Sequence, residues 1–117
     1  MNFMETQRSS KKPEFVTRMR NKFHQNYFIV TFNVRQDPET KEWLYNEVTI
    51  LPGHNTYEGI VDTIVQAEYP VPNMQAIQNN YLRTNRTQEH EAEMETMQNW
   101  RDMAKDVARD AMEIIGE

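Results

Sequence analysis

Side chains able to perform acid–base chemistry are few in this sequence, and they are scattered along it. The three histidines, His24, His54 and His90, fall in three separate segments. Glu58 follows His54 by four residues, so the two could act as a general acid–base pair, but no third polar group accompanies them. We therefore interpret His54 as a loop residue that supports the start of the next helix.

Metal ligands and nucleophiles are also sparse. His90, with Glu93 and Met94 one helical turn away, could touch a metal ion, although a solvent-facing histidine is the ordinary explanation for this spacing. The chain has no cysteine, which removes disulfides, thiolate sites and cysteine nucleophiles. Its only serines are Ser9 and Ser10, and its three glycines are too few for a phosphate-binding loop. We expect no catalytic, cofactor-binding or metal-binding residues, and therefore a protein that is not an enzyme.

Charge is distributed unevenly along the chain. The net charge is −5, but residues 1–24 carry +4 and the remaining residues carry −9. We divide the chain into a basic N-terminal arm, residues 1–24, and a single α+β domain, residues 25–117. The arm either docks on an acidic neighbour or is a solubilising tail. If it docks, its partner-binding residues are its cations and two of its aromatic side chains: Arg8, Lys11, Lys12, Phe15, Arg18, Arg20, Lys22 and Phe23.

The elements that must position these residues begin with a hairpin. Alternation over residues 26–35 predicts a strand with Phe28, Val30, Phe32 and Val34 on one face. The turn signal at residues 37–40 leads to a second strand at 43–51, which predicts an antiparallel hairpin. The apolar spacing within residues 14–23 of the arm also fits a short helix.

Helices account for the rest of the chain. One is expected over residues 55–68, with Asn55 as its N-cap and Glu58 completing a capping box, a short one after Pro72, and a long one over 88–115 capped by Thr87. The predicted fold is α+β, with a hairpin or small sheet packed by two to three helices. The expected core contacts are Phe28, Val30, Phe32, Ile60, Ile64, Trp100 and Val107.

The long helix carries an apolar seam of coiled-coil type. Its positions recur at spacings of three and four residues: Met97, Trp100, Ala104, Val107, Ala111 and Ile114. This seam packs either on the hairpin of its own chain or on another chain. In the second case, the candidate helix interface consists of Met97, Trp100, Val107 and Ile114.

Three sequence stretches carry a resemblance to known proteins. They are TYEGIVDTIVQAEY at 56–69, MQAIQNNYL at 74–82 and MQNWRDMAKDVAR at 97–109. With the hairpin they resemble small uncharacterised proteins encoded by tailed phages and prophages of gut bacteria, over about residues 26–110 and without the basic arm. The resemblance implies a phage context, hence a virion component or an assembly factor, and it supplies no catalytic residue.

The expected function is therefore that of a structural or accessory component of a phage particle, a capsid or tail auxiliary protein. Its expected partners are a larger phage structural protein or copies of the chain itself. One alternative is a phage assembly chaperone, and another is a nucleic-acid-binding regulator that uses the basic arm. The −9 charge of residues 25–117 opposes nucleic acid. Without a signal peptide or an apolar membrane-spanning stretch, the expected location is the virion or the host cytoplasm, with no membrane contact.

Overall fold

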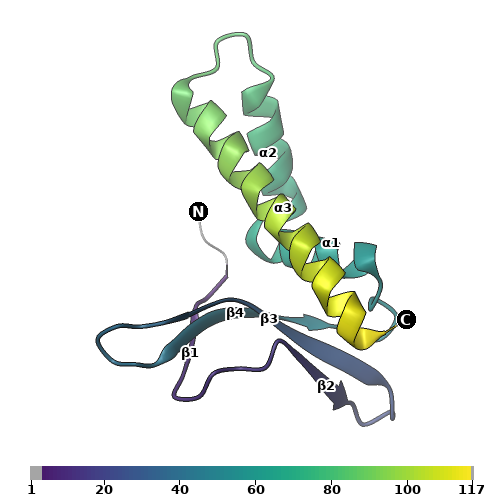
Figure 1. The fold of residues 1–117 in the computed structure, drawn as a ribbon. Coiled ribbons are helices and arrows are strands. Elements are labelled where there is room, and N and C mark those ends of the chain that lie inside the picture. Colours follow the sequence, from purple (N-terminus) through teal and green to yellow (C-terminus); the bar gives the residue numbers. More distant parts are fainter. Residues whose placement is uncertain (1–3, 117) are drawn as a thin grey trace.

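The computed structural model describes residues 4–116 and shows an α+β fold, as the sequence predicts. Within these residues, four strands form one antiparallel sheet: β1 (Gln7–Ser9), β2 (Val16–Arg20), β3 (Asn26–Gln36) and β4 (Trp43–Ile50). The helices described after them are α1 (Tyr57–Glu68), α2 (Val71–Tyr81) and α3 (Gln88–Ile115). The helices lie on one side of the sheet, and α2 and α3 extend together away from it (Figure 1).

The β3–β4 hairpin is confirmed, and the N-terminal segment completes the sheet around it. The strand order is β1-β4-β3-β2, so the two N-terminal strands form opposite edges. Residues 10–15 connect these edges across the face that the helices leave open (Figure 1). The boundary expected at residue 24 therefore falls inside the sheet, in the turn between β2 and β3.

The short helix expected within residues 14–23 is wrong, because Val16–Arg20 forms strand β2. β2 pairs with β3 in the register Val16↔Val30 and Arg18↔Phe28, so alternate side chains of β2 lie on the core face. Pairing with β3 gives the backbone of β2 hydrogen-bond partners, whereas a helix this short is marginally stable by itself. The helical spacing of the apolar residues here was coincidental.

A β-bulge interrupts the side-chain alternation that the sequence predicts for β3. Phe28, Val30 and Phe32 are at most 4% exposed, as expected, but Val34 is 37% exposed. The pairing register with β4 shifts between Phe32 and Arg35, and Asn33 has a φ of 55°, in the left-handed region. Because an extra residue reverses the side-chain alternation, Val34 points away from the core.

The core lies between the helices and the sheet. Of the predicted core contacts, Phe28, Val30, Phe32, Ile60 and Ile64 are buried. Trp100 and Val107 are half-buried and pack against that cluster. These predictions are confirmed.

Trp100 links the layers of the fold. Its indole N–H donates to the carbonyl oxygen of Ile64 in α1 at 3.1 Å. Its ring meets Phe32 of β3 edge-on, with the ring centroids 6.0 Å apart. One side chain of α3 thus contacts both α1 and the sheet.

The N-caps of α1 and α3 are threonines, whereas α2 begins after Pro70 without a side-chain cap. Thr56 caps α1 by accepting a hydrogen bond from the Gly59 N–H at 3.0 Å, so the predicted cap at Asn55 is wrong by one residue. Thr87 caps α3, as predicted. The Thr87 hydroxyl accepts from the His90 N–H, while the Thr87 N–H donates to His90 Nδ1 at 3.2 Å. This histidine therefore completes a capping box.

Candidate partner-binding surface

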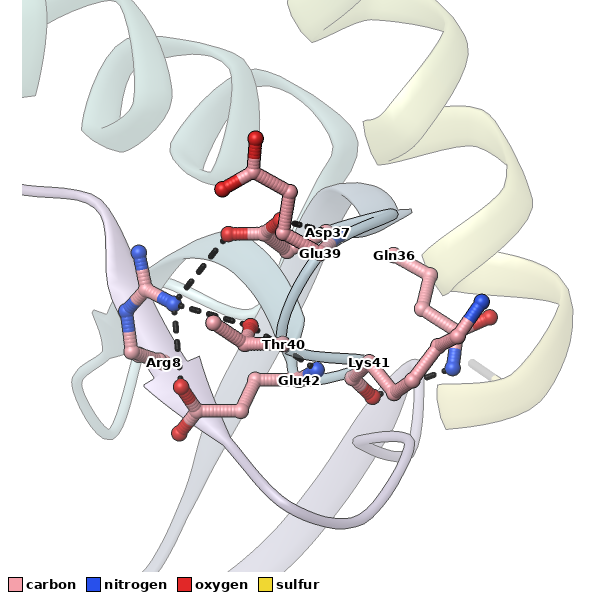
Figure 2. Close-up of polar contacts among 7 residues, drawn as sticks. All are labelled: Arg8, Gln36, Asp37, Glu39, Thr40, Lys41 and Glu42. Atoms are coloured by element: carbon pink, nitrogen blue, oxygen red, sulfur yellow. Dashed lines mark hydrogen bonds and ion pairs between the residues drawn. The ribbon is translucent and has the colours of Figure 1, made fainter.

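The residues predicted to bind a partner divide into two groups in the structure. The first group makes contacts within the chain. Arg8 Nη1 forms ion pairs with Glu42 at 3.0 Å and with Asp37 at 3.4 Å, and it also reaches the Thr40 hydroxyl, as Figure 2 shows. The hydrogen bond to Glu42 is the main cause of the raised pKa of Arg8. Arg8 thus fastens β1 to the turn between β3 and β4.

The same turn lowers the pKa of Asp37. The main cause is the hydrogen bond from the Glu39 backbone N–H to Asp37 Oδ1, at 2.9 Å. The backbone of Thr40 and the side chain of Arg8 add smaller effects in the same direction. The Asp37 carboxylate therefore stabilises the turn in which it lies.

Further members of the first group lie in the connector between β1 and β2, residues 10–15. Lys12 Nζ lies 5.5 Å from the centroid of the Trp43 ring, on the open face of the sheet. Phe15 is half-buried and packs against the core cluster. Lys11 precedes them in an exposed position, and its backbone N–H donates to Ser9 Oγ at 3.2 Å. Phe15 therefore holds the connector against the fold, whereas Lys11 and Lys12 form no ion pair with a carboxylate within residues 4–116.

The second group remains exposed, and we call it the basic edge: Arg18, Arg20, Lys22 and Phe23. Arg18 and Arg20 belong to strand β2, and Lys22 and Phe23 to the turn that follows it. All four are exposed, and Phe23 is 70% exposed. No carboxylate within residues 4–116 forms an ion pair with these three cations. The cations are therefore available to a partner.

Aromatic contacts and a built turn hold the basic edge in place. The Arg18 guanidinium lies 5.4 Å from the centroid of the Phe28 ring, and Lys22 Nζ lies 5.3 Å from that of Phe23. Asn21 Oδ1 accepts hydrogen bonds from the backbone N–H groups of Phe23 at 2.9 Å and Gln25 at 3.0 Å. Such a turn presents Phe23 to solvent in a defined position.

Acidic side chains gather at the opposite end of the molecule. Glu89, Glu91, Glu93 and Glu95 lie in the first turns of α3, and all four are exposed. Figure 1 shows that this end of α3 is remote from β2, in a molecule whose longest dimension is 51 Å. This group of glutamates is thus separated from β2 along the length of the molecule.

The candidate helix interface is largely used inside the fold. Met97 is fully buried, and Trp100 and Val107 pack against the core. Ile114, by contrast, is 58% exposed. Three of the four predicted residues are therefore engaged within the chain.

A pocket of about 420 Å³ lies where the end of α1 meets α2 and α3. Its lining includes Tyr69, Asn73, Asn80 and Glu93, together with Glu68, whose carboxylate accepts a hydrogen bond from the Met4 N–H at 3.1 Å. Burial, with a smaller effect from the two nearby glutamates, raises the pKa of Tyr69. The rest of the lining includes Ala76, Ile77 and Ala92, and no sequence motif pointed to this pocket.

The three histidines weighed for catalysis lie in different parts of the fold. His54 lines a smaller pocket of about 210 Å³ with Asp62 and Thr63, and Glu58 is not among its lining residues. His90 caps α3, and His24 lies in the turn after β2. Within residues 4–116, no cluster of three His, Cys, Asp or Glu side chains could hold a metal ion.

Comparison with known proteins gives no relatives for this chain: no family model, curated protein or solved structure matches it. Among the described residues, no helix has the length and apolar character needed to cross a membrane. Functional inference therefore rests on the surface itself.

Proposed function

We propose that this protein is a non-enzymatic binding protein that attaches to an acidic macromolecular partner through the basic edge. The observation that carries the proposal is the exposure of Arg18, Arg20 and Lys22, beside an exposed Phe23, with no carboxylate partner among the described residues. This cluster is positive, although the chain as a whole carries a net charge of −5.

The composition of the basic edge supports an interface. Arginine and aromatic side chains supply much of the binding energy at protein interfaces. Charge complementarity steers association and selects among partners. The negative net charge repels an acidic protein and a phosphate backbone alike, so it does not choose between them. The exposed Phe23 among the arginines is typical of a protein interface, which favours an acidic protein.

The resemblance of about residues 26–110 to small phage and prophage proteins supplies the biological setting of this proposal. In that setting, the protein is an accessory component of a phage particle, and its partner is a larger structural protein with an acidic surface.

The test compares two pairs of charge reversals that alter the net charge equally. The first pair, Arg18→Glu with Arg20→Glu, changes the basic edge. The control pair, Arg83→Glu with Lys105→Glu, changes exposed cations elsewhere. Binding to poly-L-glutamate and to duplex DNA is measured by fluorescence anisotropy at low and at high salt.

We expect the basic-edge pair to weaken binding to poly-L-glutamate by about tenfold or more, and the control pair to weaken it by less than about threefold. Binding to poly-L-glutamate should fall with salt, because exposed charges are screened. Equal losses in the two pairs, or tighter binding of duplex DNA than of poly-L-glutamate, would contradict the proposal.

A further inference from the structure

On one side of strand β2, the backbone N–H and C=O groups form no hydrogen bonds with another strand within residues 4–116. β2 is the last strand in the order β1-β4-β3-β2, so only one of its sides is paired. Two hydrogen bonds bracket it: the Thr31 N–H donates to the Phe15 carbonyl at 2.8 Å, and the Asn21 N–H donates to the Gln25 carbonyl at 2.9 Å. Phe15 and Asn21 therefore direct their backbone groups toward β3.

The alternation of antiparallel pairing fixes the residues between them. Hydrogen-bonded and non-hydrogen-bonded pairs alternate along an antiparallel ladder. Thr17 and Met19 thus direct their N–H and C=O groups toward β3, whereas Val16, Arg18 and Arg20 direct theirs outward. The outer side of β2 offers three residues' backbone groups to an incoming strand.

We propose that this outer side of β2 binds an extended acidic segment of the partner, which adds to the sheet as a further strand. The inference rests on the proposed function, since it specifies how the basic edge holds its partner. Strand addition to an open sheet edge is an established mode of peptide recognition, in which backbone hydrogen bonds give affinity and alternate side chains give specificity.

The side chains of β2 define the chemistry of that segment. Arg18 and Arg20 lie on one face of the strand, about 6.8 Å apart at the usual rise of about 3.4 Å per residue. Glutamate or aspartate at every second position of the added strand would face them. The intervening residues would lie beside Met19, which is 38% exposed on the other face. An alternation of acidic with apolar or β-branched residues is therefore preferred.

Charge also argues against a second copy of the chain as the occupant. Antiparallel pairing of β2 with its own copy about Arg18 would place the two Arg18 residues directly opposite each other, with each Arg20 diagonal to the Arg18 of the other copy. Like charges directly opposite each other destabilise strand pairs, and charged edge strands prevent self-association of sheets. The same arginines attract an acidic strand, so the edge discriminates between these two occupants.

The experiment uses the full ¹⁵N-labelled chain and a capped ten-residue peptide in which glutamate alternates with valine and threonine. Amide hydrogen exchange is measured by NMR without peptide and with saturating peptide. We expect exchange at Val16, Arg18 and Arg20 to slow by about tenfold or more, because these outward amides gain hydrogen bonds. Thr17 and Met19, already bonded to β3, should show little further protection.

A peptide of the same sequence, N-methylated at every residue, is the matched control. It keeps the charges and loses the backbone donors. We expect its affinity to be lower by about tenfold or more, which corresponds to the loss of about one to two net hydrogen bonds. Equal affinity of the two peptides would overturn strand addition.

The remaining outcomes separate this inference from the proposed function. If the peptide binds, and Arg18→Glu with Arg20→Glu abolishes binding while the outward amides remain unprotected, strand addition is wrong and the basic edge remains the binding surface. If the charge reversals leave binding unchanged, both proposals fail. If these amides become protected without peptide as the chain dimerises, a second copy is the occupant and the inference is overturned.

Discussion

Arg8 and Arg18 carry the same charge, but their surroundings give them different roles. Arg8 lies between Asp37 and Glu42, whereas Arg18 lies over the Phe28 ring with no carboxylate partner among the described residues. Exposed ion pairs contribute little to stability, yet they restrict a side chain to one location. Arg8 therefore holds β1 to the turn between β3 and β4, whereas the exposed Arg18 has no such ion pair within residues 4–116.

The substitution Arg8→Ala should raise the pKa of Asp37 only part of the way to its ordinary value. The hydrogen bond from the Glu39 N–H, the main cause of the low pKa, remains in the variant. NMR titration of the Asp37 carboxyl in both chains measures the change. A complete return to the ordinary value would show that Arg8, and not the turn backbone, stabilises the carboxylate.

The low pKa of Asp37 also has a consequence for stability. Because this pKa is depressed in the folded state, the contribution of the carboxylate is present above the unfolded-state pKa and is lost as pH falls through the folded-state pKa. We expect Asp37→Asn to flatten the acidic side of the curve of unfolding free energy against pH. Urea denaturation over a series of acidic pH values checks this, and an unchanged slope would contradict it.

Gly59 provides a residue whose role is steric. A Cβ at this position would overlap the His54 carbonyl group, with the carbonyl carbon only 2.9 Å away. We expect Gly59→Ala to destabilise the fold by about 1–3 kcal/mol, although alanine favours helix by about 1 kcal/mol. Gln66→Ala, at an exposed position of the same helix, is the control for urea denaturation. Stabilisation by Gly59→Ala would show that the loop before α1 yields easily.

At the scale of elements, α3 is the helix whose packing the sequence predicts only in part. Its length and its cap at Thr87 followed from the sequence, but its buried face is rotated from the predicted seam. The buried positions are Met97, Ala104, Ala108, Ala111 and Ile115. Ile115 follows Ala104 by eleven residues, or about 3.7 residues per turn over three turns, which is close to the period of about 3.6 of a straight helix. The predicted seam assumed a heptad, with about 3.5 residues per turn.

Small residues on that face set how closely α3 approaches its neighbours. Ala108 is fully buried, so Ala108→Leu should cost about 1–3 kcal/mol through overpacking. Lys105→Leu places the same side chain at an exposed position and should change stability by less than about 0.5 kcal/mol. Thermal denaturation of both variants compares them. Equal effects would mean that α3 is loosely packed.

Trp100 gives a second test at this scale, because it joins α3 to α1 and β3. Trp100→Phe removes the hydrogen bond to the Ile64 carbonyl and part of the contact with Phe32, and should cost about 1–2 kcal/mol. Trp43→Phe, on the open face of the sheet, is the control and should cost less. Urea denaturation followed by circular dichroism measures both. A smaller loss for Trp100→Phe would place the main helix–sheet contact elsewhere.

The N-terminal strands show why the sequence patterns predicted only part of the sheet. Strong alternation over residues 26–35 predicted β3 correctly, because one face is buried. β2 is short and exposed at its edge, so its alternating residues, Val16–Arg20, gave a weak signal that a helical spacing could match. The bulge at Asn33 left no signal beyond a polar residue. Sequence composition did indicate the basic residues, but not which of them would be engaged within the chain.

At the scale of the whole molecule, the basic edge and the glutamates in the first turns of α3 are far apart along the long axis. The basic edge lies at one edge of the sheet, and the glutamates in the first turns of α3 lie at the end of that helix remote from the sheet (Figure 1). Exposed charges this far apart are screened from each other at physiological salt. A partner can therefore engage the basic edge without competition from the acidic end of the same molecule.

The measurement that tests this account most directly is a map of backbone amide shifts in the ¹⁵N-labelled full chain on addition of the alternating acidic peptide, at low and at high salt. We expect the shifts to cluster within residues 16–24 and to diminish at high salt. Shifts centred on Tyr69 and Glu93 would instead identify the pocket between the helices as the binding site, and would contradict the assignment of the basic edge.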